Sequence, residues 1–178
     1  MVPASLRAAP AHRPLAARPS VEGDRFRLAL ARLAGGVCIV TTVDGGGEKL
    51  GLTATAVTSV SLDPPLVLVC IDQRSRTIAP LRAGTPFVLH ILASGQEALA
   101  RRFASFALDK FTGVAHRVLP SRCPLLDGVL AGLECAVHRL VSAGDHLIVI
   151  GRVVGVHAGE ADKSPLVYCS GRYVEIER

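Results

Sequence analysis

Four short segments of the chain hold the residue types best suited to chemistry. The first, residues 51–61, reads Gly-Leu-Thr-Ala-Thr-Ala-Val-Thr-Ser-Val-Ser and alternates hydroxyl-bearing with small apolar side chains. Threonine is β-branched and common in strands, so strand composition by itself would explain this alternation. In a functional interpretation, small side chains let a planar ring lie on the strand, with hydroxyls and backbone amides at the edge of the ring.

The other three segments combine charge with turns. Residues 72–77 (Asp-Gln-Arg-Ser-Arg-Thr) follow an apolar run and open a short helix. Free amides, hydroxyls and guanidinium groups there suit an anion, although N-capping by Ser75 beside solvated arginines is the alternative. Residues 109–111 (Asp-Lys-Phe) place a lysine after a predicted helix, and residues 144–146 (Gly-Asp-His) place a histidine in a turn. Either side chain could instead be an ordinary solvated group.

Several common chemistries lack their signatures. The histidines and cysteines show neither zincin nor zinc-finger spacing, so no metal site is expected. A Gly-x-Ser-x-Gly elbow is absent, which argues against a serine hydrolase. The glycines at 45–47 lack the Lys-Ser/Thr of a phosphate loop, and no Gly-x-Gly-x-x-Gly lies between a strand and a helix. Hydroxyl-rich strand surface remains, which suits a polar, phosphorylated ligand.

Composition narrows the partners. The 178 residues are 49% hydrophobic but only 4% aromatic, an apolar excess that favours a buried subunit interface. The net charge of +5 includes Arg7, Arg13 and Arg18; without them, 17 basic residues face 15 acidic ones, a net charge of +2. A nucleic-acid partner is therefore not expected. No apolar run has membrane-spanning length, and five cysteines without a CxxC pair predict a reduced, cytoplasmic protein.

The hydrophobic pattern predicts more strands than helices. Strands are expected over residues 37–43, 50–62, 66–71, 87–92, 129–141, 147–156, 166–168 and 172–176. Helices are expected over 24–33, with Asp24 as the cap, and over 75–81 and 95–106. Short turns join the strands, so we predict a mainly β fold with peripheral helices (α+β), an antiparallel barrel.

The ends of the chain differ in composition. Residues 1–22 are mostly Ala, Pro and Arg and predict a disordered tail, with an organelle transit peptide as the alternative. Residues 23–178 form the predicted single domain.

In combination, the segments resemble the flavin reductase family, which has the FMN-binding split-barrel fold and supplies reduced flavin to two-component monooxygenases. The resemblance runs from about residue 26 to residue 173. The segments that carry it, in order, are 51–56, 59–67, Ser75-x-Thr77, 87–92, 109–111, 133–135, 144–146, 165–168 and 171–173.

The resemblance implies two groups of flavin contacts. Thr53, Ala54, Thr55 and Ser59 would line the flavin ring and ribityl chain. His90 takes a further cofactor-contact position, where the family usually carries Asn. The phosphate contacts would come from the turn at 72–77: Ser75 and Thr77, together with Arg74 or Arg76. Asp72 in the same turn is a further implied cofactor-site residue.

The remaining implied roles belong to the tail of the flavin and to the nicotinamide. Lys110 and Phe111 would lie by the flavin tail, with a neighbouring subunit as one source. His146 would stand where the nicotinamide enters, and would bind and orient it without acid–base work, because the cofactors carry the chemistry.

The resemblance thus implies an NAD(P)H:flavin oxidoreductase, a homodimer that uses NADH or NADPH, reduces FMN or FAD, and passes diffusible reduced flavin to a monooxygenase. The alternatives within this fold are a reductase of a corrinoid or ferric complex, a non-enzymatic flavin-binding module, and an enzyme of the pyridoxal-phosphate oxidase type.

Overall fold

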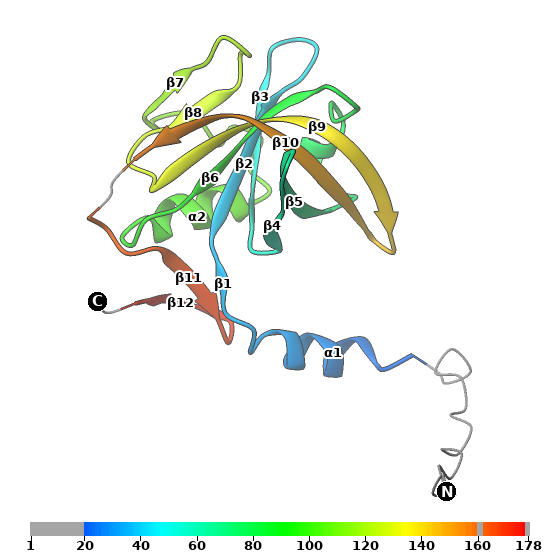
Figure 1. Ribbon diagram of the computed structural model, residues 1–178. Helices are drawn as coiled ribbons and strands as arrows, with labels where there is room; N and C mark the ends of the chain where they lie inside the picture. The colour runs from blue at the N-terminus through cyan, green and yellow to red at the C-terminus, as the bar shows by residue number, and fades with distance from the viewer. Residues whose placement is uncertain (1–19, 160–161, 177–178) are drawn as a thin grey trace, which may run out of the picture.

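The computed structural model describes residues 20–159 and 162–176 of the chain. This part is mainly antiparallel β-structure with two α-helices (Figure 1). The main sheet contains β2 (Cys38–Val43), β3 (Lys49–Ala54), β4 (Val57–Leu62), β5 (Pro65–Asp72), β6 (Pro86–Ile91), β9 (Ala131–Ala143) and β10 (His146–Ala158). A smaller sheet contains β1 (Gly35–Gly36), β11 (Leu166–Cys169) and β12 (Arg172–Glu175), and a hairpin contains β7 (His116–Val118) and β8 (Pro124–Leu126). The helices are α1 (Gly23–Leu30), α2 (Glu97–Ala104) and the single 3₁₀ turn η2 (Arg76–Ile78).

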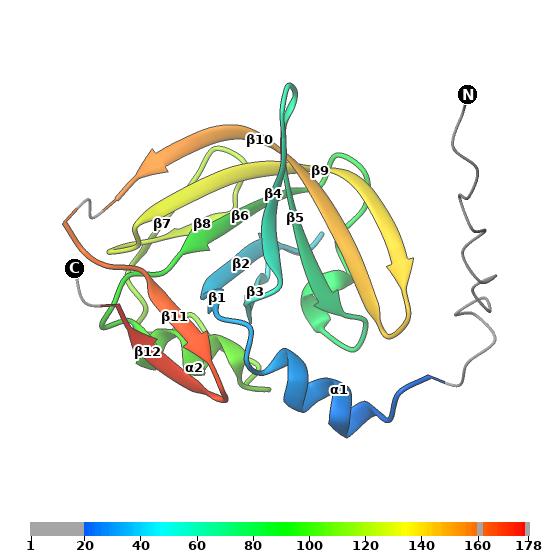
Figure 2. The same cartoon turned by 60° about the horizontal axis from the view of Figure 1, so that its bottom comes forward.

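The main sheet has the order β3-β2-β6-β9-β10-β5-β4, so its two edge strands are neighbours in the sequence. Only residues 55 and 56 carry the chain from β3, which pairs with β2, to β4, which pairs with β5. The sheet therefore curls until its edges approach each other, as Figure 2 shows. We call the space between β3 and the end of β5 the seam.

The predicted single strand over 50–62 is wrong, because the chain changes partners in its middle. Cys70 donates its amide to the carbonyl of Ala56 just after the crossing. The residue pattern gives no sign of this break, since threonine, alanine and valine continue through it. The crossing depends on two pairings that are distant in sequence.

Long strands bend over one hydrophobic core. β9 and β10 have 13 residues each and pair with register shifts at Ile150/Gly151 and Val153/Gly155. A Cβ on Gly151 would lie 2.4 Å from Cζ of Phe87, so only glycine lets that ring pack against the bend. Around this ring the core holds Val40, Leu89, Cys135, Val137 and Val149.

A second cluster fixes α2 against the sheet. Ala100 and Phe103 of α2 are fully buried, together with Val37, Ile39 and Leu92. The helix is shorter than the predicted 95–106; Gln96 precedes it, and its side-chain oxygen accepts the amide of Ala93. This packing holds the end of α2 beside β3.

The first helix stands apart from the sheets (Figure 2). It was expected over 24–33 and spans Gly23–Leu30, with Glu22 at the cap position and Asp24 inside the first turn instead of at the cap. None of its residues is buried. No helix of the described part is long and apolar enough to cross a membrane.

The remaining differences concern short elements. The predicted helix over 75–81 is a single 3₁₀ turn, and β1, β7 and β8 were not predicted. Most of the predicted tail, residues 1–19, lies outside the described residues.

Candidate functional site

A cavity of about 420 Å³ lies in the seam. One wall is β3 and the link to β4; the opposite wall is the end of β5 with the turn into η2. The chain that follows α2, residues 104–111, and His146 at the start of β10 complete it. We call it the seam cavity.

The β3 wall belongs to an edge strand and combines Lys49, Leu50 and Leu52 with the smaller Gly51, Thr53 and Ala54. Thr53 donates its hydroxyl to the carbonyl of Ala100 at 2.7 Å, which ties the strand to α2. A Cβ on Gly51 would lie 2.6 Å from Cε1 of Phe103, so this glycine allows the ring to contact the backbone. Because β3 lies at the sheet edge, alternate backbone amides and carbonyls have no strand partner on the cavity side.

The turn after β5 is organised by Asp72. Its carboxylate accepts the backbone amide of Arg74 at 2.8 Å and pairs with the Arg74 guanidinium at 2.7 Å. These hydrogen bonds hold the pKa of Asp72 well below its usual range. Ser75 caps the 3₁₀ turn, since its hydroxyl oxygen accepts the amide of Thr77 at 3.3 Å, and its own hydrogen is left to donate.

Two further cations face the seam cavity. Lys110 donates to the carbonyls of Gly51 at 3.1 Å and Phe103 at 2.9 Å, and is partly buried. Burial first, and the charge of Arg76 second, lower the pKa of Lys110. Arg76 pairs with Glu48 at 3.0 Å. One end of the cavity therefore carries concentrated positive charge that is only partly neutralised.

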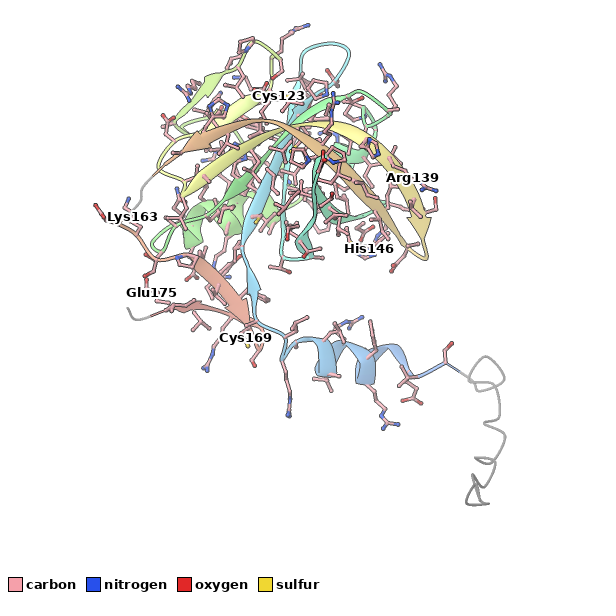
Figure 3. All side chains as sticks on the ribbon, in the orientation of Figure 1. Cys123, Arg139, His146, Lys163, Cys169 and Glu175 are labelled. Carbon is pink, nitrogen blue, oxygen red and sulfur yellow. The ribbon has the colours of Figure 1, made fainter. Side chains whose placement is uncertain are left out.

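His146 enters the cavity from the turn between β9 and β10, at the end of that hairpin (Figure 3). Its Nδ1 lies 2.7 Å from Oδ1 of Asp145, and this hydrogen bond holds the pKa of Asp145 low. Gln73 braces the turn by donating its side-chain amide to the carbonyls of Gly144 and His146, both at 3.3 Å.

Eleven of the thirteen predicted site residues line the seam cavity, and two do not. Ser59 is exposed on β4, beyond the crossing. His90 is fully buried in β6. Its Nδ1 donates to the carbonyl of Ile39 at 3.0 Å, and Nε2 accepts the amide of Leu126 at 3.1 Å. Both ring nitrogens are used inside the protein, so His90 is a structural residue that does not reach the cavity. The eleven are Thr53, Ala54, Thr55, Asp72, Arg74, Ser75, Arg76, Thr77, Lys110, Phe111 and His146.

Sequence reasoning missed the segment from Ala104 to Leu108, which lines the cavity although it belongs to no motif. Phe106 is fully exposed and Leu108 is largely exposed there. The sequence signal for this segment was the pair of apolar residues, Phe106 and Leu108, between the predicted helix and Asp109. Asp109 turns the chain by accepting the amides of Phe111 and Thr112 at 2.8 and 3.0 Å.

The donor set suits a phosphorylated aromatic ligand better than a metal. The described residues contain no group of three or more His, Cys, Asp or Glu side chains that could hold a metal ion. Instead, cations and hydroxyls gather at one end of the cavity, while the small side chains of Thr53 and Ala54 line the end of β3. The volume lies within the usual range for small-molecule sites.

Comparisons with known proteins agree with this chemistry. The model of the flavin reductase like domain family matches residues 30–177, and the chain belongs to this family. It is 35% identical over 154 residues to a flavin reductase of Pseudomonas putida, covering 86% of this chain and 91% of that protein. It is 34% identical over 161 residues to HsaB of Rhodococcus jostii, the reductase subunit of a flavin-dependent monooxygenase, covering 90% and 82%.

A solved structure extends the likeness to three dimensions. The NADH:FAD oxidoreductase SgcE6 of Streptomyces globisporus C-1027, in complex with NAD and FAD fragments, superimposes with a TM-score of 0.81 at 35% identity. The match covers 86% of this chain and 92% of that one.

Proposed function

We propose that this protein is an NAD(P)H-dependent flavin reductase that reduces FMN or FAD and supplies the reduced flavin to a partner monooxygenase. The observation that carries the proposal is the seam cavity, which combines a cationic, hydroxyl-bearing end with a small-residue strand edge in a member of the flavin reductase like family. When bound, the flavin would accept the hydride and later pass on the electrons.

The protein contributes binding and orientation. Ser75, Thr77, Arg76 and Lys110 suit the flavin phosphate, because hydroxyl and cationic donors make the strongest hydrogen bonds to phosphate oxygens. Asp72 orients Arg74 next to them.

The strand edge supplies a different kind of contact. Thr53, Ala54 and Thr55 suit the flavin ring, since unpaired backbone groups of an edge strand can meet polar ring atoms. Phe111 packs edge-on against Phe103 at 5.1 Å and thereby shapes the apolar side of the cavity.

His146 suits the nicotinamide. Its orientation by Asp145 leaves Nε2 without a hydrogen-bond partner among the described residues, so this nitrogen is available to a ligand. We assign His146 to binding and orientation of the nicotinamide cofactor.

The wider assignments follow from the same proposal. The curled main sheet, open along the seam, fits the FMN-binding split barrel. A homodimer is supported by exposed apolar side chains on α1, β4 and β10. A cytoplasmic location is supported by the five cysteines, all of which are free. The relative HsaB supports a monooxygenase as the partner.

The test is NADH oxidation with FMN and with riboflavin, in the wild type and in Ser75→Ala/Thr77→Ala. The wild type should reduce both flavins. The double variant should bind FMN at least tenfold more weakly and riboflavin unchanged, because hydrogen bonds to a charged group are worth ~1.5–3 kcal/mol each.

Thr58→Ala, an exposed threonine outside the cavity, is the matched control and should behave as the wild type. Equal weakening for FMN and riboflavin would show that the phosphate binds elsewhere, and no NADH oxidation with any flavin would refute the function.

A further inference from the structure

A second cavity, also of about 420 Å³, adjoins the seam cavity behind the end of β3. Its walls come from β3, from α2 and from the small β1-β11-β12 sheet. It contains both tyrosines of the chain. We call it the tyrosine cavity; its aromatic and polar lining residues are Thr53, Thr55, Arg101, Ser105, Tyr168 and Tyr173.

The two rings differ in what covers them. Tyr168 and Tyr173 pack edge to face with centroids 5.1 Å apart. The guanidinium of Arg101 covers Tyr173 at 4.9 Å and pairs with Glu97 at 2.7 Å. Tyr168 remains 37% exposed. A planar, uncharged ring is the ligand that best fits a partly exposed tyrosine in a cavity, and a nucleobase is such a ring.

The two cavities are continuous. Thr53, Thr55, Ala104 and Ser105 line both of them. One extended molecule, or two molecules in contact, can therefore occupy them together. Dinucleotides are extended ligands of this kind, with an aromatic ring at each end.

The direction of β3 decides which dinucleotide reaches the tyrosine cavity. The cationic groups lie near the start of β3, where Lys110 binds the carbonyl of Gly51 and Arg76 pairs with Glu48. The tyrosine cavity lies at the other end, beside Thr53 and Thr55. An adenylate attached to the flavin phosphate would therefore extend away from the tyrosines.

We infer that the tyrosine cavity binds the adenine of the nicotinamide dinucleotide, stacked on Tyr168. The inference rests on the proposed function, which brings the nicotinamide to the seam cavity. The carboxylate of Glu97 beside Arg101 neutralises the one cation that lines the described part of this cavity. A 2′-phosphate on the adenosine is thus disfavoured, and the preferred cofactor is NADH over NADPH.

The experiment compares NADH with reduced nicotinamide mononucleotide, which lacks the adenylate, at saturating FMN. Tyr168→Ala should raise KM for NADH about tenfold, the effect of losing one base–aromatic stack, with kcat unchanged. KM for the mononucleotide should stay the same. Tyr168→Phe keeps the ring and should restore KM for NADH.

A measurement on the wild type makes the test independent of any folding defect. Adenosine 5′-monophosphate should inhibit competitively against NADH and not against FMN, and adenosine 2′,5′-bisphosphate should inhibit more weakly. The inference is overturned if Tyr168→Ala leaves KM for NADH unchanged, raises it equally for the mononucleotide, or raises it for FMN. Failure of the proposed function would look different, because the wild type would then not reduce flavin with either donor.

Discussion

His146 illustrates how one neighbour can limit what a side chain does. Nδ1 lies 2.7 Å from Oδ1 of Asp145, which leaves Nε2 as the ring nitrogen without a partner among the described residues, in a side chain that lines the seam cavity. We expect His146→Ala to raise KM for NADH about tenfold with little change in kcat, because a ground-state binding contact is lost. Asp145→Asn should give a smaller effect of the same kind. Steady-state kinetics at saturating flavin measures both, and a fall in kcat at constant KM would contradict the assignment.

His90 leads to a prediction about stability. Burial lowers its pKa from 6.5 to about 4, so the folded protein keeps the ring neutral where the unfolded chain protonates it. Between pH 6.5 and 4 the unfolded state therefore binds more protons, and the free energy of unfolding should fall as the pH falls, by up to about 3 kcal/mol. Urea unfolding at several pH values measures this slope.

The comparison variant for this slope is His90→Asn, which has no titrating ring. It should be less stable at neutral pH, because the amide of Leu126 loses its acceptor, but its stability should change much less between pH 6.5 and 4. The same slope in both proteins would exclude His90 as the source.

At the residue scale, the residues of the turns were easier to predict than the hydrogen bonds of side chains buried within the strands. The segments 72–77, 109–111 and 144–146 are local turns whose residues could be singled out from the sequence, but only the family resemblance implied that they meet at one site. Members of all three line the seam cavity. The position of His90 depends on β8, which brings the amide of Leu126 to the ring. Because the β7–β8 hairpin was not predicted, nothing in the sequence indicated that this histidine has internal partners.

At the scale of elements, β3 contributes both to the packing of α2 and to the seam cavity. Gly51 contacts Phe103, and the carbonyls of both residues hold Lys110. Gly51→Ala should force the ring to move, lower the free energy of unfolding by about 1–3 kcal/mol, and weaken FMN binding. Gly36→Ala is the control, since a Cβ there meets nothing within 4 Å. Thermal melts and FMN titration test this, and two unaffected variants would refute it.

The positions of most strands along the chain were predictable, but the crossing at Thr55 and Ala56 was not. Strand existence follows from β-branched and apolar runs, which the segments 66–71 and 87–92 display directly. A change of pairing partner leaves no local mark, because the same residue types suit both pairings. The seam, and with it the shape of the cavity, is a property of long-range pairing.

For the whole molecule, we expect a homodimer. Phe26, Leu30 and Leu33 form an exposed stripe at helical spacing along and just beyond α1, which has no buried residue of its own. Light scattering at micromolar concentration should give about twice 18.7 kDa. Phe26→Glu/Leu30→Glu should shift the mass towards the monomer, whereas Leu28→Glu, on the opposite side of α1, should not. A wild-type monomer that reduces flavin would contradict the expectation.

The seam has a consequence for the chain without a ligand. β3 is an edge strand without proline, and its only charged residue is Lys49. Apart from the Gly51 carbonyl that Lys110 binds, its cavity side has no strand partner in the described part of the chain. Such an edge can serve as a template for another chain's strand, which is how β-proteins begin to aggregate. Flavin bound in the seam would cover this edge, so a preparation depleted of flavin should precipitate sooner on concentration than one kept saturated. Bound flavin would therefore also protect the protein against aggregation.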